Sequence, residues 1–244
     1  MGERIRVEAA DGAAEAYLAG EPGHPGVLFY VDAIGLRPQI EDMADRIASW
    51  GYVVLAPHVF YRDGSAAELA PAGDLREPGA REAFFGSGVS ERVAGLTPER
   101  AGADAEAWVR TLVEHAGDGP IGVTGYCMGA RLAVRTGGWF AGTVAAVGGF
   151  HGGGLVTDAP DSPHLAIGAS TAEHAFGHAD RDRSMPLEAV EGLEDALRVT
   201  GRPYLNEVYE GAPHGYTMAD TSMYQEAGAE RHFRVLEGLF GRTL

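Results

Sequence analysis

The chain has 244 residues, and its hydrophobic content of 45% is enough for the core of a globular protein. Its 35 acidic and 19 basic side chains give a net charge of −16, which argues against nucleic acid and anionic membranes as partners. No apolar run has the length of a transmembrane helix, and residues 1–8 have no secretory signal pattern. A single cysteine permits no internal disulfide, so we expect a cytoplasmic protein.

The first predicted elements form a hairpin. Residues 4–8 alternate charged and apolar side chains, Asp11-Gly12 supplies a turn signal, and residues 14–18 return as the partner strand. Residues 26–31 and 52–57 are apolar throughout, which is typical of strands buried in a parallel sheet. Between them, helical spacing predicts a helix over 38–50 that buries one apolar face. That face consists of Ile40, Met43, Ala44 and Ile47.

The stretch 58–97 interrupts this alternation. It is rich in Gly, Pro, Ala and mixed charge, and a loop of this length inside a compact domain is uncommon and usually functional. We predict one or two short helices that form a cap over the active site, with a solvated insertion as the alternative. Thr97-Pro98-Glu99 then starts a helix that runs to about His115.

The remaining elements resume the alternation. A strand at 121–124 leads into a helix from residue 130, and further strands are predicted at 144–148, 164–170 and 204–209. Helices are predicted at about 186–199 and 222–240. No linker divides the chain. The pattern predicts one α/β domain over 1–244, with a mostly parallel, doubly wound sheet and an N-terminal hairpin.

The junction after strand 121–124 carries the sequence Gly125-Tyr126-Cys127-Met128-Gly129. A Gly-x-nucleophile-x-Gly turn between a strand and a helix is the setting of a nucleophile elbow. The turn strains its central residue, and the two glycines leave room for the neighbouring strand and helix. Cys127 is therefore predicted to react as a thiolate nucleophile, and a small buried packing residue is the alternative.

A cysteine nucleophile requires a base, and the base requires a group that orients it. In this fold the nucleophile, the acid and the histidine follow one another along the chain. Of nine histidines, His214 alone lies after the last predicted strand and before the last helix. The neighbouring Gly211, Pro213 and Gly215 indicate a loop, so His214 is the predicted base.

The acid is expected after the strand predicted at 164–170. Asp180 and Asp182 both qualify by position, and Glu173 is a more distant candidate. Arg181 and Arg183 flank Asp182, as in a solvated cluster of ion pairs. Asp180 is therefore the predicted orienter of the histidine.

The elbow, the Gly177-His-Ala-Asp180 segment and the Gly-Ala-Pro-His214-Gly loop together resemble the dienelactone hydrolase family. This family is a branch of the α/β-hydrolase fold with a Cys-His-Asp triad, and the resemblance covers essentially the whole chain. It implies that Cys127 attacks the substrate, His214 is the base and Asp180 orients it.

The resemblance also assigns roles to the segment Tyr30-Val-Asp-Ala-Ile-Gly35. It implies an oxyanion hole built by the backbone N–H groups of Ala33 and Met128. Where the family carries a glutamate that keeps the thiol quiescent, this chain has the shorter Asp32. Asp32 is thus the thiol-gating candidate, and a cap of the turn before Gly35 is the alternative role.

The family binds its substrate's carboxylate with arginines, one of them four residues after the catalytic histidine, where this chain has Met218. Arg76 or Arg81 in the insertion could replace it, but we expect a more apolar substrate. His151 lies in Phe150-His-Gly-Gly-Gly154, which follows the elbow and so does not match the lipase oxyanion motif in position. The pocket candidates, each with core packing as the alternative, are Tyr30, Ile34, Phe60, Tyr61, Phe84, Phe85, His151 and Met218.

The sequence predicts a hydrolase of small carboxylic esters or lactones that uses no cofactor and no metal. Cys127 would form a thioester acyl-enzyme, which water activated by His214 would release. A thioesterase, or a lactonase of secondary metabolism, is the enzymatic alternative. A non-catalytic receptor or redox sensor could use Cys127 for covalent capture, though the candidate triad argues against it. The chain is expected to be a monomer or a homodimer.

Overall fold

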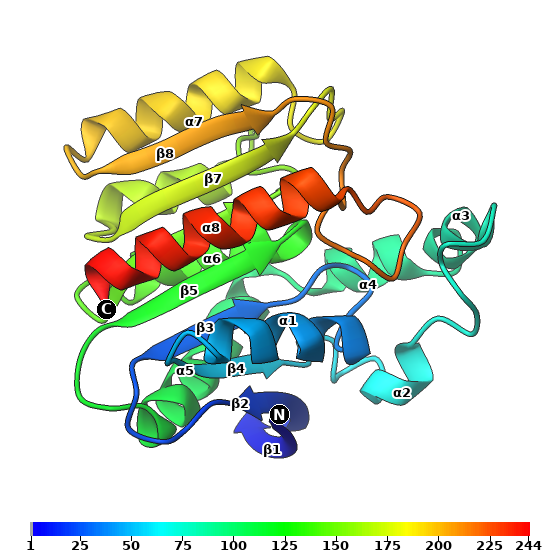
Figure 1. Ribbon diagram of the computed structural model, residues 1–244, viewed down its shortest axis with the longest axis horizontal. Coiled ribbons are helices and arrows are strands. Elements are labelled where there is room, and N and C mark those ends of the chain that lie inside the picture. Colours follow the sequence, from blue (N-terminus) through cyan, green and yellow to red (C-terminus); the bar gives the residue numbers. More distant parts are fainter. Residues whose placement is uncertain (1) are drawn as a thin grey trace.

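The computed structural model describes residues 2–244, and an eight-stranded sheet forms the centre of the molecule (Figure 1). The strand order is β1-β2-β4-β3-β5-β6-β7-β8. The β1–β2 and β2–β4 pairs are antiparallel and all others are parallel, so the N-terminal hairpin extends a parallel sheet, as predicted. The strands are β1 (Glu3–Ala9), β2 (Gly12–Ala19), β3 (Gly26–Tyr30), β4 (Val53–Pro57), β5 (Ile121–Tyr126), β6 (Val144–Phe150), β7 (Glu173–Ala179) and β8 (Tyr204–Tyr209).

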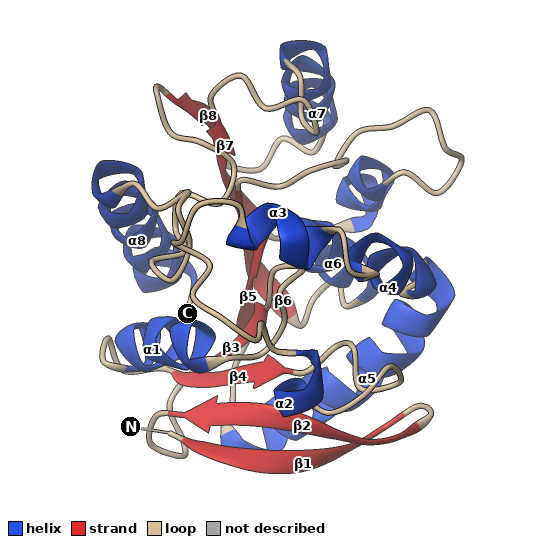
Figure 2. Cartoon of the chain, turned by 90° about the vertical axis from the view of Figure 1, so that its right-hand side faces the viewer, coloured by secondary structure: helices blue, strands red, loops and turns tan. Residues whose placement is uncertain are grey.

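Helices cover both faces of the sheet, with α1 and α8 on one face and α5, α6 and α7 on the other (Figure 2). Their bounds are α1 (Pro38–Ala48), α5 (Pro98–His115), α6 (Met128–Trp139), α7 (Leu187–Val199) and α8 (Glu226–Thr243). Helix α1 buries the four predicted residues, which are spaced three and four apart and so share one face. Among the described residues, no helix is both long enough and apolar enough to cross a membrane.

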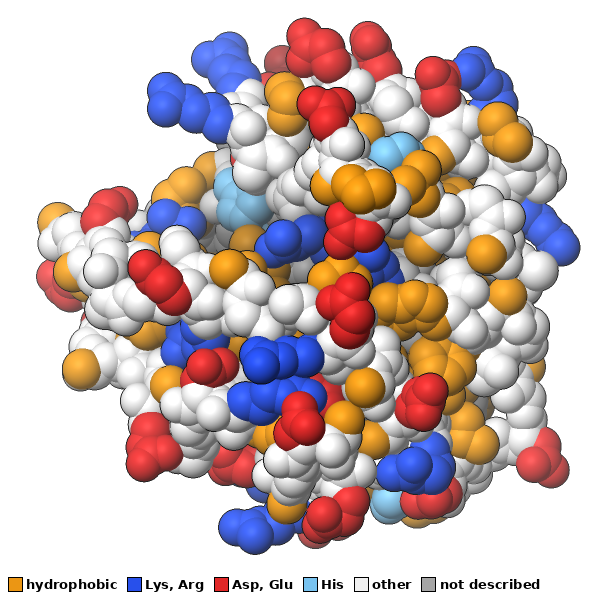
Figure 3. All heavy atoms as spheres, turned by 180° about the vertical axis from the view of Figure 1, so that it is seen from behind, with side chains coloured by type: hydrophobic (Ala, Val, Ile, Leu, Met, Phe, Trp, Pro, Cys, Tyr) orange, Lys and Arg blue, Asp and Glu red, His pale blue; other side chains and the backbone are white. Residues whose placement is uncertain are grey.

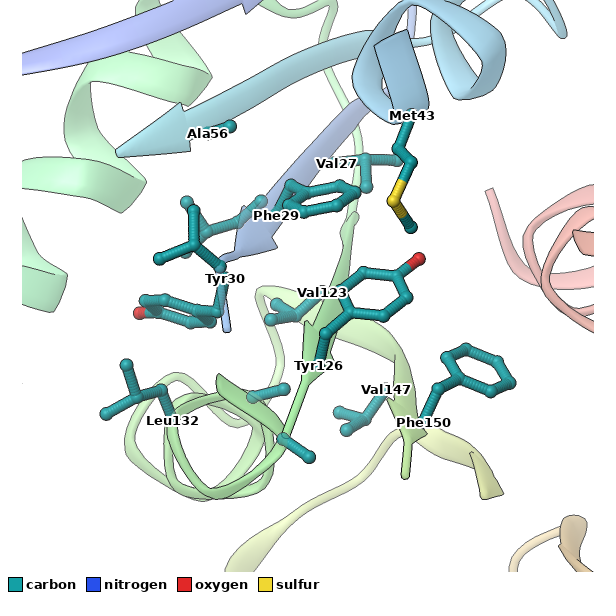
Figure 4. Close-up of a cluster of buried hydrophobic side chains, with 14 of the residues drawn as sticks. Val27, Phe29, Tyr30, Met43, Ala56, Val123, Tyr126, Leu132, Val147 and Phe150 are labelled. Atoms are coloured by element: carbon teal, nitrogen blue, oxygen red, sulfur yellow. The ribbon is translucent and has the colours of Figure 1, made fainter. Parts of the chain in front are cut away.

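The centre of the core is formed by β3, β4 and β5, which lie side by side. Every residue of these three strands is buried, as expected for parallel strands covered on both faces. Tyr126, the last residue of β5, stacks on Phe29 with ring centroids 4.8 Å apart and on Phe150 at 5.9 Å (Figure 4). These aromatic contacts anchor the end of β5 immediately before Cys127.

One predicted strand is wrong. Residues Pro163–Ala169 form a 3-10 helix, η1, and the strand lies later in the chain as β7. A short apolar run fits a strand or a helical segment equally well by periodicity, and Pro163 at its start favours the helical conformation. Glu173 opens β7 and forms an ion pair with Arg242, so it is not available as the acid of a triad at the opposite edge.

The insertion 58–97 contains three short helices where one or two were predicted. They are α2 (Ala66–Leu69), α3 (Ala80–Phe85) and α4 (Val89–Gly95). Figure 2 looks onto the carboxyl ends of the parallel strands and shows α3 in front of this edge of the sheet. The segment therefore forms a cap over the edge at which β5, β7 and β8 end.

The turn between β5 and α6 has almost no free space. Cys127 adopts φ 54° and ψ −117°, a strained conformation for a non-glycine residue. A Cβ atom on Gly125 would lie 2.1 Å from the carbonyl oxygen of Gly129, and one on Gly129 would lie 2.4 Å from that of Val31. Backbone atoms cannot yield by such distances, so both positions require glycine.

We expect Gly129→Ala to lower the free energy of unfolding by about 1–3 kcal/mol or more, because the new methyl group overlaps the backbone of the loop after β3. Urea denaturation followed by circular dichroism measures the change. The matched control is Gly241→Ala in α8, where a Cβ meets no atom within 4 Å and alanine favours the helix. Equal stability of the two variants would contradict the close approach at the elbow.

Candidate active site

Three side chains that can act as nucleophile, base and orienter meet at the carboxyl edge of the sheet. Cys127 follows β5, Asp182 follows β7 and His214 follows β8. Parallel strands end at the same edge, which is why loops far apart in the sequence come together there. A cavity of only about 20 Å³ lies beside Cys127 and His214. Its lining consists of Asp32, Ala33, Ile34, Arg81, Phe85, Cys127, His151, His214, Gly215, Met218 and Thr221.

The imidazole of His214 is held by Asp182. The His214 Nδ1 atom lies 2.5 Å from Asp182 Oδ2, and both side chains are largely buried. The other carboxylate oxygen, Oδ1, accepts hydrogen bonds from the backbone N–H of Ser184 at 2.8 Å and from its hydroxyl at 2.7 Å. Asp182 is thereby fixed in place, and the pairing at Nδ1 leaves Nε2 of His214 for the Cys127 sulfur, with which His214 also interacts.

The predicted orienter, Asp180, does not contact His214. Its Oδ2 atom accepts a hydrogen bond from the backbone N–H of Gly211 at 3.0 Å, so it stabilises the loop before the histidine. Arg181, between the two aspartates, has φ 53°, and this left-handed residue turns the chain so that Asp182 meets the histidine. The flanking arginine Arg181 is almost fully exposed and does not neutralise Asp182.

The electrostatics of the pair favour a charged histidine. Burial works to lower the pKa of His214, but the hydrogen bonds to Asp182 and Cys127 outweigh it and raise the pKa to about 10. Burial works in the opposite direction on Asp182, where His214 and Ser184 prevail and lower the pKa to about 2. At neutral pH an imidazolium therefore lies between a carboxylate and the thiol sulfur.

The backbone N–H groups of Ala33 and Met128 are the predicted oxyanion hole. Ala33 lines the cavity, and Met128 is the first residue of α6, where a helix has no internal partner for its N–H. Within residues 2–244 neither N–H donates a hydrogen bond to the protein. Both are therefore free for an oxygen atom bound near Cys127.

The loop of Ala33 is held by a buried ion pair that the sequence did not reveal. Arg37 is 4% exposed and donates to both carboxylate oxygens of Asp32, at 2.7 and 3.1 Å. It also donates to Asp220 at 2.6 and 3.1 Å. Asp32 thus lines the cavity with its charge already paired, and no hydrogen bond from it reaches Cys127. The Asp32 carboxylate also accepts a hydrogen bond from the backbone N–H of Ile34 at 3.0 Å. These contacts favour the alternative role, a cap of the turn before Gly35, over the thiol gate.

Comparison with known proteins agrees with this geometry. The model of the dienelactone hydrolase family matches residues 14–244. The chain belongs to the dienelactone hydrolase family. It is therefore a hydrolase of the class that acts on ester and lactone bonds.

Individual relatives are distant. A protein of Synechocystis sp. named "Putative carboxymethylenebutenolidase" is 24% identical over 95% of this chain and 90% of its own. A carboxymethylenebutenolidase of a Pseudomonas species is 26% identical over 54% of this chain and 53% of its own. Among solved structures, a "Putative Dienelactone Hydrolase" from Klebsiella pneumoniae superposes with a TM-score of 0.81 at 21% identity, covering 99% and 98% of the two chains. At that identity, the structural likeness establishes the fold alone.

Half of the eight residues predicted to line the substrate pocket do line the cavity beside Cys127. Four line the cavity, namely Ile34, Phe85, His151 and Met218. Four do not, namely Tyr30, Phe60, Tyr61 and Phe84. Tyr30 is buried with its hydroxyl 2.8 Å from that of Thr136, and the Tyr61 hydroxyl donates to Asp104 at 2.8 Å. For these tyrosines, packing and internal hydrogen bonds replace the predicted contact with a ligand.

Of the two arginines considered as carboxylate-binding residues in the insertion, only Arg81 lies at the site. Arg81 lines the cavity beside Cys127, and its guanidinium lies 4.7 Å over the ring of Phe85. Arg76 is exposed and pairs with Asp74 at 2.7 Å on the surface. Sequence reasoning missed Arg37, whose contacts join loops 183 residues apart. It also missed Ser184, which carries no recognisable motif.

The raised pKa of His214 has a consequence for stability. A group whose pKa rises on folding from 6.5 to about 10 stabilises the fold fully below pH 6.5, and this contribution disappears as the pH rises through 10. The loss of unfolding free energy caused by His214→Gln should therefore be largest near neutral pH and below, and small above pH 10. Urea denaturation across this range measures it. A pH-independent loss would contradict the ion pair, and His24→Gln at an exposed position serves as control.

Proposed function

We propose that the chain hydrolyses small carboxylic esters or lactones through a thioester on Cys127. The observation that carries this proposal is the line of Asp182, His214 and Cys127, in which a buried carboxylate holds the imidazolium against a strained elbow cysteine. In space the three groups follow one another as a nucleophile, its base and the orienter of the base. Along the chain the nucleophile comes first, then the acid and then the histidine, as expected for this fold.

Acylation begins when the Cys127 sulfur attacks the acyl carbon and the electrons of the carbonyl bond move to its oxygen. The N–H groups of Ala33 and Met128 would stabilise this oxyanion. On collapse, the carbon–oxygen bond of the ester breaks and the leaving alkoxide takes the proton of the His214 imidazolium. The products of this step are the alcohol and the thioester. In a lactone, the alcohol remains tethered to the acyl group.

Deacylation uses the same groups in reverse. Neutral His214 accepts a proton from a water molecule as the water oxygen attacks the thioester carbon. Collapse of the second oxyanion breaks the carbon–sulfur bond and releases the carboxylic acid. The thiolate and the imidazolium are regenerated together, and the charged pair supported by Asp182 is restored.

Substrate entry requires movement of the cap. The cavity of about 20 Å³ holds about one water molecule, which is far less than an ester needs. Arg81 and Phe85 of α3 lie over Cys127 at the cavity, and α3 contributes no buried residue to the core. Displacement of this short helix is therefore the least costly way to open the site.

The charge of Arg81 supports a substrate with one carboxylate group. Among the described residues, Arg81 forms no ion pair with an acidic side chain, and it lies beside the cavity with Cys127. Ile34, Phe85 and Met218 supply apolar contacts in the same cavity. We therefore favour a small, largely apolar ester or lactone that carries one negative charge, over a neutral substrate.

The triad assignment is tested by two matched variants. Asp182→Asn should lower kcat for p-nitrophenyl acetate by roughly 10²–10⁴-fold, because the amide no longer fixes the tautomer of His214 or stabilises its charge. Asp180→Asn should leave kcat nearly unchanged, and Cys127→Ala should abolish turnover. Sensitivity at Asp180 instead of Asp182 would overturn the assignment. Turnover that survives Cys127→Ala would exclude Cys127 as the nucleophile, and a Cys127 adduct that forms but never turns over would favour a receptor or sensor.

The role of Arg81 is tested with a pair of esters that differ in charge. Arg81→Gln should raise KM about tenfold to a hundredfold for an aryl ester carrying a carboxylate, because a charge-assisted hydrogen bond is lost. KM for a neutral ester of the same size should change little. Arg76→Gln removes the same charge from the surface of the insertion and should affect neither substrate. An equal effect of Arg81→Gln on both esters would exclude charge recognition.

A further inference from the structure

A second pocket, of about 210 Å³, borders the elbow through Met128. It lies between α6 and the segment that joins α4 to α5. Its apolar lining includes Val93, Leu96 and Leu132, and its charged lining consists of Arg131, Arg135 and Asp161. The proposed reaction uses none of these charged residues. Figure 3 views the side of the molecule formed by α5 and α6, where basic side chains lie near the middle of the face among acidic and hydrophobic ones.

The two arginines of this pocket are poorly neutralised. Arg131 is partly buried, and it forms no hydrogen bond or ion pair with any residue from 2 to 244. Arg135 is 15% exposed, and its nearest acidic neighbour is Asp161 at 3.8 Å, which is too far for a hydrogen bond. The exposed Glu99 also acts on its charge. Asp161 is itself 56% exposed, so water screens its charge. The pocket therefore contains two guanidinium groups, and the two carboxylates that act on Arg135 are both exposed.

The positions of Arg131 and Arg135 on α6 make their positive charges still less favourable. They are four residues apart on α6, so they share one face of the helix and repel each other. Arg131 is also in the first turn of α6, where the helix dipole is positive and a cation is unfavourable. Burial lowers the pKa of both side chains, and the charges of Cys127 near Arg131 and of Asp161 and Glu99 near Arg135 do not offset it. In a chain with a net charge of −16, such a concentration of positive charge calls for a counter-ion.

We propose that this pocket binds a small molecule with a phosphate or carboxylate group on an apolar body. Paired guanidinium groups match the oxygen atoms of such anions, and Val93, Leu96 and Leu132 would contact the apolar part. The anion could belong to a free ligand or to the distal part of an ester bound at Cys127, since Met128 borders both sites. Binding does not require catalysis, so this inference can fail or succeed independently of the proposed hydrolase mechanism.

Phenyl phosphate is a suitable probe, with inorganic phosphate and phenol as its two halves. Isothermal titration calorimetry at constant ionic strength should detect phenyl phosphate binding to the wild type and to Cys127→Ala. Arg131→Gln and Arg135→Gln should each raise Kd at least about tenfold, because one charge-assisted contact to the anion is lost. The matched control is Arg234→Gln, which removes an exposed arginine on α8 and should bind like the wild type. Absence of binding to the wild type, or equal binding to Arg131→Gln, would overturn the proposal.

A thermal measurement without ligand gives an independent check. Arg131→Met should raise the Tm of the ligand-free protein, because a desolvated charge without a partner is replaced by an apolar side chain of similar length. Phenyl phosphate should raise the Tm of the wild type and not that of Arg131→Met. A Tm for ligand-free Arg131→Met at or below that of the wild type would show that the guanidinium is already compensated, and would contradict the proposal.

The two sources of the anion predict different kinetics. A free ligand should bind without competing with p-nitrophenyl acetate or with an ester that bears a phosphate. The distal part of a substrate should give competition between phenyl phosphate and the phosphate-bearing ester, and Arg131→Gln should raise KM for that ester alone. Either pattern supports the anion site and identifies its use. Competition that persists unchanged in Arg131→Gln would place phenyl phosphate at another site and overturn the proposal.

Discussion

The site depends on one interaction, an imidazolium held between a buried carboxylate and the sulfur of an elbow cysteine. Asp182 and His214 come from loops after neighbouring strands. The side chain of Asp182 is 6% exposed and that of His214 is 23% exposed. Their mutual attraction is strong because little solvent separates them. The parallel sheet is required for this arrangement, since it brings the ends of β5, β7 and β8 to one edge.

A second ion pair fixes the frame around the first. Arg37 joins Asp32, beside the amide of Ala33, to Asp220, six residues after His214. The loop of Ala33 and the histidine loop are therefore joined by one network of ion pairs.

Local signals were sufficient for most of the fold and for the positions of two of the three candidate groups. The Gly-x-Cys-x-Gly turn and the placement of His214 after the last strand depend on neighbours in the sequence, and both were predicted correctly in position. The choice between Asp180 and Asp182 was not local. It depends on the left-handed conformation of Arg181 and on a partner 32 residues away, neither of which leaves a pattern in the sequence. The strand β7 was missed because the apolar run before it satisfies the same periodicity.

Helix α3 carries Arg81 and Phe85 four residues apart, so the group that would recognise a charge and the group that covers the sulfur belong to one rigid turn. An anion bound by Arg81 would thus hold Phe85 over the reacting atoms as well. The carboxylate of the substrate does not react, but the free energy of its binding would help to exclude bulk water from the ester group that does. A substrate without that charge would not hold α3 in place over the site. Its reaction would then take place in contact with more water.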